Sequence, residues 1–435
     1  MEPPKYDNHI LTEEKAALSN GEERMRNQNK ASPYRSTLIA CYLGYITQAI
    51  TVNLAPLFFV IFQNQYGVSY TQIANLVLIT FVIQIIVDAS MVKLTPIVGY
   101  RRSAVFAHIF SVIGLVCLTI LPRVMPAYAG ILISVFFYSI GGGLTEVVIS
   151  PIVDALPGDA KASAMSLLHS FYSWGQMAVV ILSTVLLSIV GNANWFYIPL
   201  VWAILPLCNI FLFARVPIVE PEEEQKSNGA GKFLRSPIFV VAVLMMICSG
   251  ASEQAMSQWA SLFAERGLGV PKIAGDLLGP CMFAFCMAIG RTVYGICGEK
   301  INIEKALMAC AGLTIGCYIV VAFVPNPVVA LLGCALTGLG VSLMWPGMLS
   351  YSSQKYDYKA GPVLFSLLAL GGDIGCSVGP WITGCVSDTY LATVERTAEA
   401  ESQAIRYGLL TAVIFPALML VLSLIMRKLP PPKQL

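Results

Sequence analysis

The chain has 435 residues, of which 56% are hydrophobic and 12% are charged, and its formal net charge is +2. Because a soluble domain carries about 25% charged residues, this composition excludes a water-soluble globular protein. The basic residues are scattered, which argues against nucleic acid as a partner. The twelve cysteines lie in apolar segments without Cys-x-x-Cys spacing, so we expect neither a metal site nor a cofactor.

Residues 1–36 are polar and mixed in charge, and we interpret them as a disordered tail. Beyond them, a series of long apolar segments is separated by turn-forming residues. A bilayer core needs ~20 apolar residues per helical crossing, and a helix satisfies every backbone group within lipid. The sequence therefore predicts an all-α membrane protein with transmembrane helices at 37–62, 71–94, 103–122, 127–152, 163–190, 195–215, 237–264, 275–298, 304–324, 327–352, 361–390 and 403–427.

The basic residues also predict the orientation. Most of the 27 Lys and Arg residues fall on the side that holds the N-terminal tail, the even-numbered loops and the C-terminus. Basic residues accumulate on the cytoplasmic side of membrane proteins. We therefore expect a multi-pass protein of the cell membrane with both termini in the cytoplasm.

The two halves of the chain resemble each other. SLLHSFYSWG at 166–175 aligns with SLLALGGDIG at 366–375. A near-constant offset is what duplication of a six-helix unit produces, and paired repeats around a central site are typical of secondary transporters. The predicted domains are a six-helix bundle over 37–215, a cytoplasmic linker over 216–236, a second six-helix bundle over 237–427 and a tail over 428–435.

Glu146 is the main candidate for proton coupling. Ionisable side chains inside a membrane span are costly and tend to be functional. Glu146 lies in GGGLTEVVISP, where three glycines permit close helix approach and Pro151 permits a kink. A carboxyl enclosed away from water keeps its proton to higher pH than an exposed one, as proton coupling requires. The alternative is a structural carboxyl locked to a cation or a backbone donor.

Four ionisable groups fall at a similar depth below the cytoplasmic ends of their spans: Asp88, Glu146, His169 and Arg291. At 1.5 Å per residue they lie roughly 9–12 Å deep, which predicts a polar cluster. His169 joins Glu146 as a candidate for proton coupling and substrate contact, or is a neutral imidazole between helices. We interpret Asp88, Arg291 and Asp373 as gate or structural charges, and expect Asp373 to face the second span.

Further candidates for substrate binding come from the first, fifth, seventh and tenth spans. Amide side chains both donate and accept hydrogen bonds, as sugar hydroxyls do. Aromatic rings offer a flat surface to the apolar face of a sugar ring, although tryptophan also anchors helices at lipid interfaces. The candidates are Gln48, Asn53, Tyr172, Glu253, Gln254, Gln258, Trp259 and Trp345.

The loop after the second span ends in Gly99-Tyr100-Arg101-Arg102. With the repeated six-helix pattern, this loop resembles the signature loop of the major facilitator superfamily, and the resemblance covers about 37–427. It implies two bundles that rock about a central site, with Arg101 and Arg102 as gate or structural charges. The chain departs from the family signature at Pro96, where the family carries an aspartate.

Within that superfamily, the segment around Glu146 and Pro151 is similar to the L-fucose/proton symporter group, which has a glutamate and a proline at this spacing. The polar pattern at 166–175 is also similar. This resemblance implies a sugar or polyol as the substrate. The group's second acid on the first span is missing here, near Val52 and Asn53, so coupling through two such carboxylates is not supported.

The leading hypothesis is therefore a secondary transporter, and not an enzyme, that moves a small polar solute by alternating access. The expected partners are that solute, the lipid bilayer and a coupling ion, for which a proton is favoured and sodium is the alternative. An exporter of amphipathic drugs or metabolites is a second hypothesis, since sixteen methionines suit adaptable binding. A non-transporting receptor with the same fold is the third.

Overall fold

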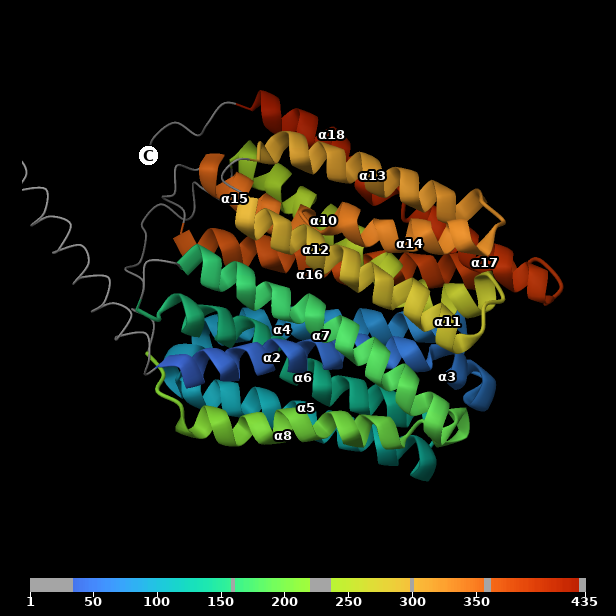
Figure 1. Ribbon diagram of the computed structural model, residues 1–435, viewed down its shortest axis with the longest axis horizontal. Helices are drawn as coiled ribbons and strands as arrows, with labels where there is room; N and C mark the ends of the chain where they lie inside the picture. The colour runs from blue at the N-terminus through green and yellow to red at the C-terminus, as the bar shows by residue number, and fades with distance from the viewer. Residues whose placement is uncertain (1–33, 158–160, 220–235, 298–300, 356–360, 430–435) are drawn as a thin grey trace, which may run out of the picture.

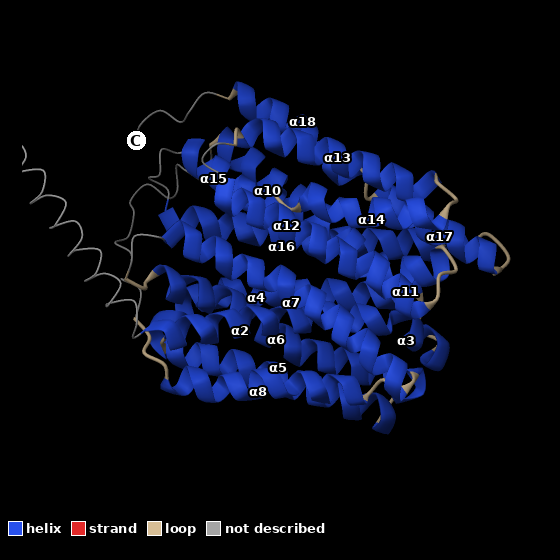
Figure 2. Cartoon of the chain, in the orientation of Figure 1, coloured by secondary structure: helices blue, strands red, loops and turns tan. Residues whose placement is uncertain are grey.

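The computed structural model describes residues 34–157, 161–219, 236–297, 301–355 and 361–429, and within these ranges the regular structure is entirely helical (Figure 2). The first half contains α2 (Arg35–Asn53), η2 (Ala55–Phe58), α3 (Phe59–Tyr66), α4 (Tyr70–Val98), α5 (Tyr100–Val124), α6 (Ala127–Asp154), α7 (Lys161–Val190), η3 (Asn192–Asn194) and α8 (Tyr197–Arg215).

The second half contains α10 (Pro237–Leu262), η4 (Phe263–Gly267), α11 (Lys272–Asp276), η5 (Leu277–Cys281), α12 (Met282–Cys297), α13 (Ile303–Phe323), α14 (Pro327–Val341), α15 (Met344–Lys355), α16 (Gly361–Leu391), α17 (Ala398–Thr411) and α18 (Ile414–Lys428). In Figure 1 these helices form the upper group and those of the first half form the lower group.

The described residues include 11 helical stretches that are long and apolar enough to cross a membrane. The 31-residue helix α16 lies between the last two of them, and its glycines and polar residues make it less hydropathic. It completes the twelve predicted crossings, whose boundaries match the predicted ones to within a few residues. The predicted all-α, twelve-helix membrane fold is confirmed. Most of the predicted 1–36 tail and 216–236 linker lies outside the described residues, as do residues 430–435 of the predicted C-terminal tail.

The bundle has two distinct ends (Figure 1). We call the end at which α2 begins and α18 finishes the terminal end, and the opposite end the far end. The N-terminal and C-terminal halves meet mainly where α4 packs against α16 and where α7 packs against α12. We call this contact between the halves the seam. The functional site is built along it.

Several crossings that the sequence predicts as continuous helices are interrupted. The first span changes from α-helix to a 3-10 turn at Ala55 and Pro56, because proline has no N–H and cannot continue the hydrogen-bond ladder. The missing donor would have bonded to the carbonyl of Val52, four residues earlier. The Gln258 side chain from the opposite half donates to that oxygen instead, at 3.4 Å.

Glycines set two close helix crossings near the seam. On α6, a Cβ at Gly142 would lie 2.8 Å from Gln84 Nε2 of α4. Where α10 crosses α16, a Cβ at Gly250 would collide with the carbonyl of Gly372. The glycines before Glu146 therefore serve close helix approach, the role expected from the sequence.

Candidate functional site

The central carboxyl of the site belongs to Glu146 on α6. The Gln48 side chain of α2 donates a hydrogen bond from Nε2 to Glu146 Oε2 at 2.7 Å. Gln48 is buried, and its Oε1 atom has no hydrogen-bond partner among the described residues. The pair therefore presents one carboxylate already held by an amide and one amide oxygen still free to accept a hydrogen bond from a ligand.

A second pair links α2 to α7 in the same region. Asn53 Nδ2 approaches the Tyr172 hydroxyl at 3.2 Å and the Ala49 carbonyl at 3.0 Å. Asn53 is buried and Tyr172 is half-buried. Both are predicted substrate-binding residues, and the structure brings them together.

Arg291 of α12 forms a buried ion pair that joins three helices. Its Nη2 atom lies 3.0 Å from Glu253 Oε2 on α10, and the two side chains are 11% and 8% exposed. Its Nη1 atom donates across the seam to Ser173 Oγ on α7 at 3.2 Å. Arg291 thus pairs with Glu253 and not with Asp88.

Asp88 of α4 instead meets Asp373 of α16. The two carboxyl groups are hydrogen-bonded to each other across the seam, and both lie close enough to Glu146 for their charges to interact. Asp373 thus faces the second span. Three carboxyl groups from three helices therefore gather at the centre of the bundle.

His169 of α7 lies beside this group without bonding to Glu146. Its ring packs edge-on against Tyr45, with centroids 5.3 Å apart, and it lies near enough to Arg291 to interact with the guanidinium charge. Tyr45 in turn shares a 2.7 Å hydrogen bond with Ser150 on α6. His169 therefore belongs to the cluster, and in this conformation it makes no direct bond with the proposed proton carrier.

The remaining predicted substrate residues lie either in side-chain hydrogen bonds between amides or in packed aromatic contacts. Gln254 Oε1 accepts a hydrogen bond from Gln258 at 3.0 Å. Trp259 is completely buried, packs against Phe59 and Tyr70, and donates to the Pro380 carbonyl at 3.1 Å. In this conformation Trp259 thus serves packing. The half-buried ring of Trp345 lies over Gly372, where a Cβ would overlap it.

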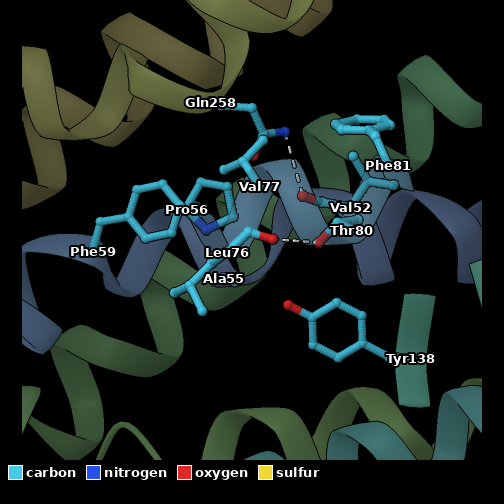
Figure 3. A pocket seen from close by; sticks show the side chains of 10 residues that line it. All are labelled: Val52, Ala55, Pro56, Phe59, Leu76, Val77, Thr80, Phe81, Tyr138 and Gln258. Atoms are coloured by element: carbon cyan, nitrogen blue, oxygen red, sulfur yellow. Dashed lines mark hydrogen bonds between the residues drawn. The ribbon is translucent and has the colours of Figure 1, made fainter. Parts of the chain in front are cut away.

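A small pocket with room for about one water molecule lies beside the Pro56 break (Figure 3). Among the predicted substrate residues only Gln258 lines it. The other polar lining groups are Thr80 and Tyr138, and the rest of the lining is apolar. The pocket is therefore mostly apolar, with a polar edge.

Arg101 and Arg102 lie apart from this site. Arg101 donates to the carbonyls of Phe213 and Ala214 at 2.9 and 3.1 Å, at the end of α8. These are the carbonyls that a helix terminus leaves without partners, so Arg101 has a structural role here. Arg102 is exposed.

Sequence reasoning missed Gln84. This side chain is 1% exposed, lies on α4 beside Gly142, and its Nε2 atom has no hydrogen-bond partner among the described residues. Its spacing of four residues from Asp88 places both on one helix face. That spacing is the available signal, although Gln84 stands as a lone amide among apolar neighbours in FVIQIIVD.

The far end is closed by hydrogen bonds that cross the seam. Asp388 Oδ2 of α16 accepts the backbone N–H of Thr71 at the start of α4 at 2.6 Å. Asp276 Oδ2 accepts from Thr184 Oγ1 of α7 at 3.0 Å. All cross-seam hydrogen bonds among the described residues lie at the far end or at the centre. The structure therefore shows a conformation with a closed far end.

We predict that Asp388→Ala weakens this closure. The carboxylate caps the first turn of α4, and loss of a cap costs about 1 kcal/mol, or about a fivefold shift in populations. The shift is measured by double electron–electron resonance between spin labels at Ala193→Cys and Glu395→Cys, two exposed far-end positions, in a background without native cysteines. We call these two positions the far-end label pair.

Glu399→Gln is the matched control for this experiment. Glu399 is an exposed far-end acid in the first turn of α17, and its replacement removes the same charge without a cross-seam contact. An Asp388→Ala distance distribution identical to that of Glu399→Gln would contradict the assignment of Asp388 to closure.

Comparisons with solved structures give the same fold over nearly the whole chain. The xylose transporter of E. coli, in a partially occluded inward-open conformation, matches with a TM-score of 0.72 at 14% identity and covers 93% of this chain and 100% of that one. A bacterial homologue of the human lysosomal transporter Spinster matches with a TM-score of 0.71 at 16% identity. That match covers 91% of this chain and 97% of the homologue. The E. coli fucose:proton symporter matches with a TM-score of 0.63 at 16% identity. That match covers 91% of this chain and 99% of the symporter.

These identities show a shared fold and no more. No curated protein sequence matches the chain closely enough to count as a relative. The family model of the Major Facilitator Superfamily matches residues 41–380, which include every residue of the central cluster. This match, together with the twelve crossings, shows that the chain is a multi-pass membrane transporter and belongs to the major facilitator superfamily.

Proposed function

We propose that this transporter moves a small polar solute, a sugar or a polyol, by alternating access, and that proton binding at Glu146 couples the movement to a proton gradient. The observation that carries the proposal is the bond between Gln48 and Glu146 between α2 and α6. A half-buried carboxyl with an amide partner can gain or lose a proton while the amide holds its position.

The composition of the site supports a polyhydroxylated solute. Gln48 Oε1 and Gln84 Nε2 are buried and without partners among the described residues, so they offer one acceptor and one donor. Leaving such groups unpaired is costly, and a ligand with several hydroxyls would satisfy both. The ring of Trp345, which lies over Gly372 of α16, offers an apolar surface.

The fold neighbours agree with this proposal without proving it. Two solved structures with the same fold are a xylose transporter and a fucose:proton symporter. A nucleoside transporter has the same fold as well, at 12% identity. Nucleosides also carry a sugar ring, so they belong in the set of test solutes.

We infer the membrane orientation from charge. The basic residues gather at the terminal end, so this end faces the cytoplasm and the far end faces outward. In this orientation the structure is closed to the outside. Import would then release the solute at the terminal end.

A second candidate is export of amphipathic compounds. The observation in its favour is the pocket beside Pro56, whose lining is mostly apolar and includes Phe59, Leu76 and Phe81. The central cluster of carboxyl and amide groups argues for the polar solute, because an apolar ligand would leave these groups unpaired.

The proposed function is tested with purified protein in liposomes. Monosaccharides, polyols and nucleosides are screened as radiolabelled solutes, with and without an inward proton gradient, and a sodium gradient replaces it in a parallel series. We expect uptake of at least one of these solutes, raised by the proton gradient and not by sodium. Efflux of an amphipathic dye with no solute uptake would overturn the proposal in favour of the exporter.

A further inference from the structure

The contact between Asp88 and Asp373 lies across the seam, with one carboxyl on each half of the protein. Asp373 is 2% exposed and Asp88 is half-buried. Neither Asp88 Oδ1 nor Asp373 Oδ2 has a hydrogen-bond partner from an N–H or hydroxyl group among the described residues. Each carboxyl therefore has the other as its polar neighbour.

This arrangement needs a proton. Two ionised carboxylates are acceptors only and cannot hydrogen-bond to each other, and two facing negative charges repel strongly in a medium of low dielectric constant. One proton placed between them turns one carboxyl into a donor and the other into an acceptor. The contact is then a strong, charge-assisted hydrogen bond.

Among the residues that the structure describes, the other charged groups around the pair do not supply a counter-charge. Glu146 on α6 adds a further acid. On α10, Glu253 is already paired with Arg291 of α12. On α7, His169 packs against Tyr45 and lies near Arg291, and it forms no hydrogen bond or ion pair with either aspartate among the described residues. None of these described groups therefore provides the positive charge or the donor that two facing carboxyls need.

We propose that Asp88 and Asp373 share one proton, and that this shared proton links α4 to α16 and stabilises the present conformation, in which the far end is closed. When the proton leaves to water, two carboxylates face each other and α4 separates from α16. The link is a second proton site, beyond Glu146 of the proposed function. It concerns the conformational equilibrium without solute and does not require Glu146 to carry the transported proton.

The test measures the far-end label pair as a function of pH, without solute. We expect the ratio of far-end-open to far-end-closed protein to rise about tenfold between pH 6 and pH 9, as one charge-assisted hydrogen bond is lost. In Asp373→Asn and in Asp88→Asn, the amide donates permanently to the remaining carboxylate. Both variants should stay closed and change less than about twofold over this range.

Infrared spectroscopy provides the second measurement. The spectrum of the unlabelled protein at neutral pH should contain one protonated-carboxyl C=O band that disappears in Asp373→Asn and in Asp88→Asn. Glu304→Gln is the matched control, because Glu304 pairs with Arg427 at the terminal end, 3.0 Å away, and lies apart from the seam. It should leave both the band and the pH response unchanged.

Three results would overturn the proposal. The first is an unchanged pH response in both Asn variants, and the second is the absence of a protonated-carboxyl band assignable to the pair. The third is a closed state that follows sodium concentration at fixed pH, which would assign the link to a metal cation. Failure of Glu146→Gln to alter transport would refute the proposed function alone, because the label-pair experiment involves no solute.

Discussion

Glu146→Gln is expected to abolish concentrative uptake and to leave solute exchange intact. The glutamine keeps an oxygen that accepts the 2.7 Å hydrogen bond from Gln48, but it cannot release a proton. A gradient of one pH unit is worth about 1.4 kcal/mol per proton, or about tenfold accumulation. The variant's accumulation ratio should fall to about 1, because an uncoupled carrier only equilibrates its solute.

Gradient-driven uptake and counterflow in the same liposomes measure this difference. Counterflow needs only solute binding and the change between the two conformations, so it should persist in Glu146→Gln. Gln48→Ala is the companion variant, since it removes the amide and keeps the carboxyl. It should weaken solute binding without abolishing coupling. Concentrative uptake by Glu146→Gln equal to that of the wild-type protein would refute the role of Glu146.

Arg291→Ala is expected to cause the largest loss of stability. It leaves the Glu253 carboxylate, whose side chain is 8% exposed, without its partner. Breaking a buried ion pair by removing one member costs about 3–5 kcal/mol. It also removes the Arg291–Ser173 bond across the seam. The free energy of unfolding, measured in mixed micelles, should fall by about 3 kcal/mol or more.

Two further variants make this test specific. The double variant Arg291→Met with Glu253→Gln removes both charges and should recover most of the lost stability. Arg427→Ala breaks an exposed ion pair of the same 3.0 Å length and should change stability by less than about 1 kcal/mol. Equal stability of Arg291→Ala and Arg427→Ala would show that the buried pair contributes no more than an exposed one.

The crossings could be predicted because a hydrophobic length of ~20 residues is a property of each segment alone. The interruptions could not. Pro56 and the break before Met344 lie within spans of uniformly high hydropathy, and a proline in a membrane helix is often tolerated. Whether the helix bends depends on a partner such as Gln258, which comes from a helix far away in the sequence.

The depth of each charge could also be predicted, whereas its partner could not. Counting residues along a span gives the height of a side chain in the membrane, but not the direction in which it points. Asp88 and Arg291 lie at similar predicted heights, yet Asp88 faces Asp373 and Arg291 faces Glu253. The tilt and rotation of the packed helices decide such pairings.

Trp259 illustrates the same limit for a neutral side chain. Its neighbours in sequence include Glu253, Gln254 and Gln258, which favour a place in a polar cavity. In the structure its indole N–H donates to the Pro380 carbonyl, and its ring packs against Phe59 and Tyr70. The residues next to Trp259 in sequence suggest a polar environment. The way the helices cross decides instead which side chains the ring contacts.

Because of the proline break in the first span, we expect opening of the far end to bring water to one backbone carbonyl. The Val52 carbonyl lacks its usual helical donor because of Pro56, and the amide from the opposite half takes that place. When the halves part at the far end, that amide withdraws with its own half. A buried backbone oxygen is costly without a donor, so we expect a water molecule to replace the amide as it leaves. We therefore expect this oxygen to become hydrated whenever the far end opens, and a bulkier side chain that kept it dry should slow that opening.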